Sequence, residues 1–335
     1  MLCPGPRADN ETARIHPSAY RLGRRLPLVA VAQQSGIPVI GYLGLTSAKA
    51  DAYLLAPFRK ALSEAGFDEG RNVVIEYRFA ERDVSRLPQL ASELVRRNVA
   101  VIFTGTTVSA LATKAATSTI PVIFAIGADP VRSGLVASLN RPGGNLTGIS
   151  FFTNQMEAKR LALLHEIVPK AELVGVLLNP NNPFFANQSS DVEEASRALN
   201  LKIHIERASN EQEIAKAFKE FTQRKVGALL VGADPYFNSQ RSLVIAPAAE
   251  LRVPAIYEWR EFSEAGGLMS YGTSLTEAYR QAGDFVARVL KGANPADLPV
   301  LQASKFEFVI NLKTAKSLDL PLAPPVFARA DEVIE

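Results

Sequence analysis

Small hydroxyl side chains stand just after two short apolar runs in the first half of the sequence. Thr46 and Ser47 follow the run VIGYL, and Thr106 and Thr107 follow AVIFT. At the N-terminus of a helix, such hydroxyls and the backbone N–H groups can hold a carboxylate, helped by the helix dipole. Simple N-capping explains the same residue types equally well. The pattern therefore indicates either a carboxylate subsite or two helix caps.

Carboxylates, amides and aromatic rings follow other apolar runs. Asp129, Asp234 and Glu258 could each pair with a ligand ammonium group, although turn or capping roles explain each of them singly. Aromatic walls with a few polar groups are typical of small-ligand sites, although a core position is the commoner role of any single aromatic residue. Further candidates of these kinds are Phe151, Asn179, Asn182, Phe184, Tyr236, Phe237, Tyr257, Trp259 and Tyr271. Together they predict recognition of a small organic molecule.

The sequence lacks the motifs of the main catalytic classes. It contains no G-x-x-x-x-G-K-[ST] phosphate loop, no G-x-G-x-x-G after an apolar run and no H-E-x-x-H zinc motif. Its histidines are His16, His165 and His204, and none lies near the end of a predicted strand. The single cysteine, Cys3, excludes an internal disulfide and the cysteine pair of two-lobed racemases. We therefore expect no catalytic residue, no metal site and no cofactor.

Short β-branched apolar runs alternate with segments of helical periodicity from Ile37 onward. The ten runs with strand character are residues 37–43, 73–79, 100–104, 120–126, 146–150, 172–178, 201–206, 227–231, 253–257 and 267–271. Strands that alternate with helices form βαβ units, and right-handed crossovers then require open parallel sheets. The predicted fold class is α/β, with two Rossmann-like, doubly wound lobes joined by a hinge.

The two halves of this pattern resemble each other. Gly41 in VIGYL matches Gly175 in LVGVLL at an offset of 134, and RRNVAVIFTG (96–105) matches QRKVGALLVG (223–232). Two lobes of one topology form a cleft between the carboxyl ends of their sheets, where a ligand can bind. The tetrapeptide GADP, at 127–130 and 232–235, does not fit this offset and indicates turn chemistry at two strand ends.

The later elements imply that the chain crosses between the lobes more than once. An amphipathic helix is predicted over 274–292, followed by an alternating strand over 305–312 and a short helix over 314–320. We expect a first lobe of residues 37–148 plus 273–296 and a second lobe of residues 149–272 plus 297–335. The small residues of GISFF (148–152) and SYGTS (270–274) are the expected hinge segments.

Composition separates a leader from the folded body. The 335 residues are 47% hydrophobic and 21% charged, which excludes disordered, collagenous and coiled-coil chains. The first 32 residues carry a charge of +3, and the remainder has 32 basic and 32 acidic residues, so we expect no nucleic-acid partner. Residues 1–36 end in a basic stretch, LPLVAVA and QQSG, which indicates a degenerate signal segment or a misassigned start. A disordered tail is the alternative.

Long strings in the body are similar to one family. They include IPVIGYL, FRKALSEAGFDEGRNVVIEYRFAERDVSRLPQLASELVRRNVAVI, IPVIFAIGADPVRSGLVASLNRPGGNLTGISFF, LLNPNNP, GADPYFNSQRSLV, AGGLMSYG and FEFVINLKTAK. Nearly all of residues 37–335 resembles the substrate-binding proteins of bacterial ABC transporters with the type I periplasmic-binding fold. The similar subgroup includes tryptophan- and tyrosine-binding members.

The resemblance implies a set of ligand contacts. On the first lobe these are Thr46, Ser47, Thr106, Thr107 and Asp129, on the second Asn179, Asp234 and Tyr257, and near the hinge Phe151 and Tyr271. It also implies a non-catalytic, monomeric periplasmic protein that captures a small organic solute and delivers it to an inner-membrane ABC permease. We expect an amino-acid-like solute, and an aromatic one in particular, because hydroxyls suit a carboxylate, an aspartate suits an ammonium group and tyrosines suit a ring.

Two other functions stay open at the level of the sequence. The ligand-sensing half of a transcription regulator shares such a fold, but residues 1–36 contain no recognisable helix-turn-helix. A two-lobed transferase or epimerase could use the acidic and tyrosine side chains of the cleft as acid and base.

Overall fold

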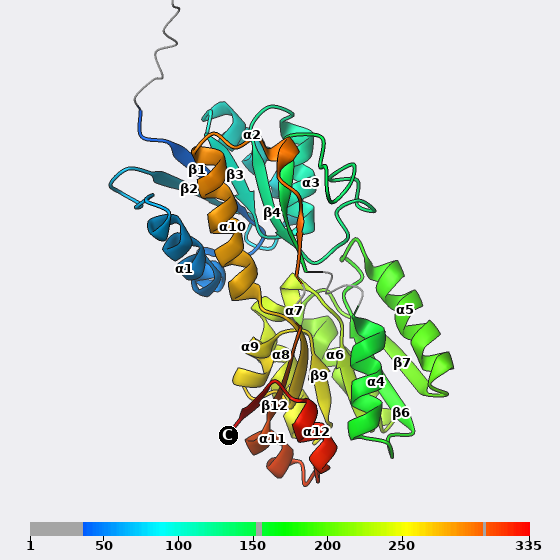
Figure 1. Cartoon of the computed structure of the whole chain (residues 1–335). Helices are drawn as coiled ribbons and strands as arrows, with labels where there is room; N and C mark the ends of the chain where they lie inside the picture. Colours follow the sequence, from blue (N-terminus) through cyan, green and yellow to red (C-terminus); the bar gives the residue numbers. More distant parts are fainter. Residues whose placement is uncertain (1–35, 152–155, 304–305) are drawn as a thin grey trace, which may run out of the picture. The chain divides into compact units, whose positions relative to one another are not determined.

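Two β-sheets organise the residues that this computed structural model describes, 36–151, 156–303 and 306–335 (Figure 1). Within those ranges, the first sheet has six parallel strands in the order β11-β5-β4-β3-β1-β2. Its strands are β1 (Val39–Gly44), β2 (Val74–Phe79), β3 (Val101–Thr104), β4 (Val122–Ile126), β5 (Leu146–Ser150) and β11 (Leu301–Gln302). The helices that belong with it are α1 (Ala48–Glu64), α2 (Leu87–Arg96), α3 (Thr107–Ala116) and α10 (Leu275–Leu290).

The second sheet has seven strands within the same described ranges, in the order β13-β12-β10-β9-β8-β6-β7. Only the β10–β12 pair among them is antiparallel. Its strands are β6 (Leu173–Leu178), β7 (Lys202–Arg207), β8 (Ala228–Val231), β9 (Ala255–Tyr257), β10 (Met269–Thr273), β12 (Phe306–Asn311) and β13 (Glu332–Ile334). Its helices are α4 (Glu157–Ile167), α5 (Phe185–Ala198), α6 (Glu211–Gln223), α7 (Pro235–Ser239), α8 (Arg241–Glu250), α9 (Arg260–Glu264), α11 (Leu312–Ser317) and α12 (Pro324–Arg329).

The internal repeat is visible in the strand order. The order β5-β4-β3-β1-β2 of the first sheet recurs as β10-β9-β8-β6-β7 in the second. Gly41 on β1 and Gly175 on β6 occupy the same place, and a Cβ atom on either would lie 3.0 Å from a side-chain carbon of Leu94 or Phe221. Those two side chains belong to α2 and α6, the equivalent helices of the repeat. The two halves therefore share their packing as well as their topology, and the predicted α/β fold class is confirmed.

Both faces of the first sheet are buried, which explains the continuous apolar runs. Side chains alternate along β1, so that Ile40 and Tyr42 join one core cluster while Leu43 joins another. The helix α10 lies against α1 on the first of these faces (Figure 1). It begins after Ser274, whose hydroxyl accepts a hydrogen bond from the N–H of Glu277, as the pattern over 274–292 predicts.

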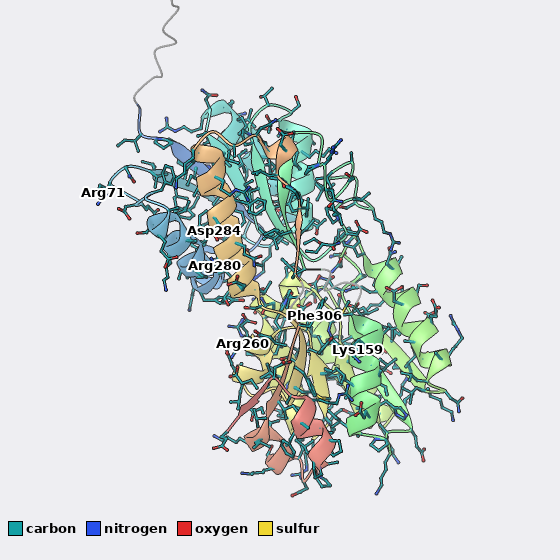
Figure 2. The ribbon with its side chains drawn as sticks, in the orientation of Figure 1. Arg71, Lys159, Arg260, Arg280, Asp284 and Phe306 are labelled. Carbon is teal, nitrogen blue, oxygen red and sulfur yellow. The ribbon has the colours of Figure 1, made fainter. Side chains whose placement is uncertain are left out.

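The outward face of α10 carries ion pairs that complete its amphipathic pattern. The Arg280 guanidinium lies 2.9 Å from the Asp284 carboxylate one turn further along and 2.7 Å from Glu277 (Figure 2). Exposed i, i+3 and i, i+4 pairs of this kind contribute only a few tenths of a kcal/mol each. Packing of the apolar face on α1 therefore holds the helix in place.

The chain passes between the sheets at three places: between β5 and α4, between β10 and α10, and between β11 and β12. The expected division assigned residues 297–335 to the second lobe, but β11 pairs with β5 in the first sheet, so that assignment is wrong for 301–302. A two-residue strand carries no detectable periodicity.

We propose lobes of residues 37–150 plus 274–303 and 156–273 plus 306–335. Part of the expected hinge GISFF and the leader up to residue 35 lie outside the described residues.

Candidate ligand-binding site

A cavity of about 1130 Å³ lies between the carboxyl ends of the two sheets. Most of its lining residues come from the loops and helices that follow β1 and β3 in the first lobe and β6, β8 and β9 in the second. A few more follow β2, β4, β5, β7 and β10. Seven of the ten ligand contacts that the resemblance implies line it: Thr46, Ser47, Thr106, Thr107, Phe151, Asn179 and Asp234. The further candidates Asn182, Phe184, Tyr236 and Trp259 line it too. The internal repeat thus brings equivalent strand ends of both lobes to one cavity, as expected for sheets of this type.

The first lobe presents two helix N-termini to the cavity. The Ser47 hydroxyl caps α1 by accepting a hydrogen bond from the N–H of Ala50 at 3.3 Å. Thr106 caps α3 in the same way, accepting from the N–H of Ser109 at 3.2 Å. Both caps also line the cavity, so capping and ligand contact are compatible here. Each helix end adds backbone N–H groups and a positive dipole end, which favour an anionic group.

A buried aspartate that sequence reasoning missed lies beside these hydroxyls. Asp51 is 7% exposed and lines the cavity. Its carboxylate accepts hydrogen bonds from the Tyr42 hydroxyl at 2.8 Å and from the Thr46 hydroxyl. Burial raises the pKa of Asp51, and the two hydrogen bonds oppose that rise. The spacing of Ser47 and Asp51, four residues apart on one helix face, was a signal that could have found it.

Tyr279 of α10 lines the same side of the cavity, and its hydroxyl lies directly against Gly105. A Cβ atom on Gly105 would lie 1.8 Å from the Tyr279 hydroxyl oxygen. Burial raises the pKa of Tyr279 well above its usual range, and so does the nearby Asp51 carboxylate. Gly105 is therefore the residue that allows a helix from the C-terminal part of the chain to complete the first-lobe site.

The second lobe holds an amide–carboxylate network centred on Asp234. Its carboxylate accepts hydrogen bonds from Asn179 Nδ2 and Asn182 Nδ2, both at 2.9 Å, and from the backbone N–H groups of Tyr236 and Phe237. Burial raises the pKa of Asp234, and these hydrogen bonds oppose the rise. Because four protein donors already bind this carboxylate, its first role is to cap α7 and to fix the two asparagines. Turn chemistry thus explains this copy of GADP.

Three buried ionisable residues, Glu157, Arg160 and Glu258, pack behind that network. Arg160 lies 3.3 Å from the Glu157 carboxylate, and its Nε donates to the Tyr271 carbonyl at 3.0 Å. Glu258 accepts a hydrogen bond from the N–H of Asp234 at 3.2 Å. Burial raises the pKa of Glu258 well above its usual range, partly offset by Arg160. The cluster ties β8, β9 and β10 together behind the cavity and does not line it.

Contacts between the two lobes form one edge of the cavity. Asn238 Nδ2 on α7 donates a hydrogen bond to the Tyr53 hydroxyl on α1 at 3.1 Å. The Arg241 guanidinium lies 5.7 Å from the centre of the Tyr53 ring. All three residues line the cavity. Tyr53 and Asn238 are 185 residues apart, so no local pattern could have paired them.

Three of the ten ligand contacts that the resemblance implies do not line the cavity. Tyr257 is 1% exposed and stacks on Phe262 in the core, with ring centres 4.7 Å apart. The Tyr271 ring stacks on Phe306 at 5.9 Å. Asp129 caps its own turn, accepting from the N–H groups of Val131 and Arg132 at 2.8 and 3.1 Å. Strand alternation turned both tyrosines away from the cavity, and the face of a buried strand is not visible in an apolar run.

Across the three described ranges, no group of three or more His, Cys, Asp or Glu side chains could hold a metal ion. In the same ranges no helix is both long enough and apolar enough to cross a membrane.

The two repeated lobes and the cavity between them define a two-lobed solute-binding protein with the type I periplasmic-binding fold. Solute-binding proteins of only 12 and 13% identity share this fold, with TM-scores of 0.59 and 0.57. Residues 48–334 match the family model described as ABC transporter substrate binding protein, and the chain belongs to this family. It is the solute-binding component of an ABC import system, as the sequence predicts.

Two of the similar proteins are named for an aromatic amino acid or hold one. A tyrosine-binding protein of Clostridioides difficile is 30% identical over 263 residues, which cover 78% of this chain and 75% of that protein. An ABC domain from Streptococcus pneumonia, solved in complex with L-Trp, is 27% identical with a TM-score of 0.80, covering 89% of this chain and 100% of that one. The ligand-free, open structure of a Clostridium difficile substrate-binding protein is 25% identical with a TM-score of 0.65, covering 89% and 99%.

Proposed function

We propose that the chain binds a free aromatic amino acid, tyrosine or tryptophan, in the cavity between its lobes and releases it unchanged to an ABC permease. We further propose that it works as a monomer in the periplasm and catalyses no reaction. The observation that carries the ligand class is the pairing of two hydroxyl-capped helix N-termini with an aromatic wall. The similarity to a tyrosine-binding protein and to a domain in complex with L-Trp supports the same class.

The first lobe is the side that suits the amino-acid head group. Ser47 and Thr106 lie at helix N-termini, where the ligand carboxylate would meet hydroxyls, backbone N–H groups and the positive ends of two helix dipoles. The aromatic residues that line the cavity and would enclose the ligand ring are Tyr42, Tyr53, Phe151, Phe184, Tyr236, Trp259 and Tyr279.

Asp51 is the best partner for the ligand ammonium group. Each of its carboxylate oxygens accepts one hydrogen bond from a protein hydroxyl, and each therefore keeps acceptor capacity. The Asp234 carboxylate already receives four protein donors, three on Oδ1 and one on Oδ2, which is twice the number at Asp51. Asp129 does not line the cavity. The count of donors thus moves the proposed ammonium site from the sequence-predicted aspartates to Asp51.

A thermal-shift screen of the full chain against the twenty amino acids, sugars and nucleosides tests this proposal. A ligand at 100 times its Kd adds about 2.7 kcal/mol to the native state. We expect a clear rise in Tm with tyrosine or tryptophan, and chromatography of the bound fraction should recover the ligand unchanged. A rise with sugars or nucleosides alone would contradict the ligand class. A chemically altered ligand would contradict the absence of catalysis.

A further inference from the structure

Two polar atoms at the edge of the cavity lack hydrogen-bond partners. They are the indole Nε1 of Trp259 and the amide Oδ1 of Asn238, and neither has a partner in the described part of the chain. Both residues line the cavity, and they are only 5% and 8% exposed. A buried polar group left unpaired costs about 1–3 kcal/mol. One of these atoms is a donor and the other an acceptor, so each can form a hydrogen bond with a polar group of a ligand.

The surroundings hold both side chains in place. Asn238 uses its Nδ2 to donate to the Tyr53 hydroxyl at 3.1 Å, which leaves Oδ1 as the remaining atom of the amide. Trp259 immediately precedes α9, and its carbonyl accepts a hydrogen bond from the N–H of Phe262 at 3.0 Å. Neighbouring strands β8 and β9 lead into α7 and α9. The two atoms are therefore presented by fixed elements of one lobe.

Asn238 contacts α1 at a distance from the proposed head-group site. Tyr53, the partner of Asn238, lies six residues after the cap Ser47 on this helix. At 1.5 Å per residue the two positions are about 9 Å apart along the axis. That separation is comparable with the length of tyrosine from its carboxylate to its hydroxyl. Asn238 therefore contacts α1 about one ligand length away from the cap that would hold the carboxylate.

We propose that Trp259 and Asn238 are specificity-determining residues that bind the polar end of the ligand side chain. In this proposal, which rests on the proposed function, Trp259 Nε1 donates to that group and Asn238 Oδ1 accepts from it. A phenolic hydroxyl satisfies both atoms, an indole N–H satisfies only Asn238, and a phenyl ring satisfies neither. The protein therefore binds tyrosine most tightly, tryptophan less tightly and phenylalanine least.

Isothermal titration of the full chain with L-tyrosine, L-tryptophan and L-phenylalanine tests the ranking without any mutation. We expect tyrosine to bind about tenfold or more tightly than phenylalanine, with tryptophan between them. Equal affinity for tyrosine and phenylalanine would overturn the inference while leaving the proposed function intact. If none of the three binds, it is the proposed function that fails.

Two substitutions then assign the preference to these residues. Trp259→Phe removes the indole N–H and keeps a ring, and Asn238→Leu removes the amide at similar volume. In each variant the ratio of tyrosine to phenylalanine affinity should fall toward one, while the Kd for phenylalanine changes by no more than about threefold. Tyr77→Phe, which removes the hydroxyl of a tyrosine on β2 that does not line the cavity, is the matched control and should keep the ratio. A ratio unchanged in both variants would overturn the assignment.

Discussion

The two lobes share a strand order but present different hydrogen-bonding groups to the cavity between them. The first lobe offers hydroxyls at two helix N-termini and, in Asp51, a carboxylate with acceptor capacity to spare. The second lobe offers Asp234, whose carboxylate is already bound by four protein donors. Duplication of a fold thus repeats the scaffold, whereas the few residues after each strand decide what each copy binds. Substitutions can test this contrast.

The largest effect on stability is expected at Asp234. Asp234→Ala leaves the side chains of Asn179 and Asn182 and the first turn of α7 without their acceptor, and should lower the free energy of unfolding by about 3 kcal/mol. Urea unfolding measures this loss. Asp129→Ala, at the other copy of GADP, removes only two backbone hydrogen bonds of a partly exposed turn and is the matched control. Equal losses of unfolding free energy in the two variants would show that Asp234 stabilises the fold no more than Asp129 does.

Asp51 is expected to affect ligand binding more than stability. Asp51→Asn keeps the size of the side chain but removes its negative charge, and should weaken binding of an aromatic amino acid by about 2 kcal/mol or more. Titration calorimetry measures the change in Kd, with unfolding measured alongside. An unchanged Kd in a folded variant would show that the ammonium group of the ligand does not contact Asp51. The acidic side chains of the second lobe would then be the next ones to substitute.

Glu261 gives the second lobe a pH-dependent contribution. Burial raises the pKa of this carboxyl from 4.5 to about 6, so the native state binds the proton more tightly than the unfolded chain. Its contribution to stability is fully present below pH 4.5 and is lost as the pH rises through about 6. Glu261→Gln should therefore raise the free energy of unfolding by about 2 kcal/mol above pH 7 and by little at pH 4. The same gain at both pH values would contradict this account.

The smallest effect compares one helix cap from each lobe. Ser47 caps α1 beside the cavity, and Asn210 caps α6 in the second lobe, accepting from the N–H of Glu213 at 3.0 Å outside the cavity lining. Replacing either by Ala should cost about 1 kcal/mol of stability. Only Ser47→Ala should also weaken ligand binding. Equal Kd values in the two variants would show that the first-lobe cap serves the helix alone.

Local patterns were sufficient for much of the fold. The ten predicted apolar runs coincide with β1 to β10 within a few residues, because β-branched runs bounded by turns are the direct signature of buried parallel strands. The repeat of Gly41 and Gly175 indicated two lobes before any contact was known. The short strands β11 and β13 were missed, since two or three residues carry no periodicity.

The sequence predicted the candidate site only for residues that directly follow the carboxyl ends of strands. Thr46, Ser47, Thr106 and Thr107 line the cavity because parallel strands place their carboxyl ends at one edge of the sheet. Tyr257 and Tyr271 were predicted by the same rule but face the core and the neighbouring strand. In a strand buried on both faces, hydrophobicity does not reveal which side chain points to which side.

By itself, the sequence determined the class of fold, the duplication, the strand ends and the absence of catalytic motifs, because each depends on residues that are near one another in the chain. Only the tertiary structure decided that Tyr53 meets Asn238, that Tyr279 lies against Gly105, and that the Asn179 and Asn182 amides donate to Asp234. These contacts join residues tens to nearly two hundred positions apart. Their partners are chosen by the packing of whole helices and sheets, which no local spacing encodes.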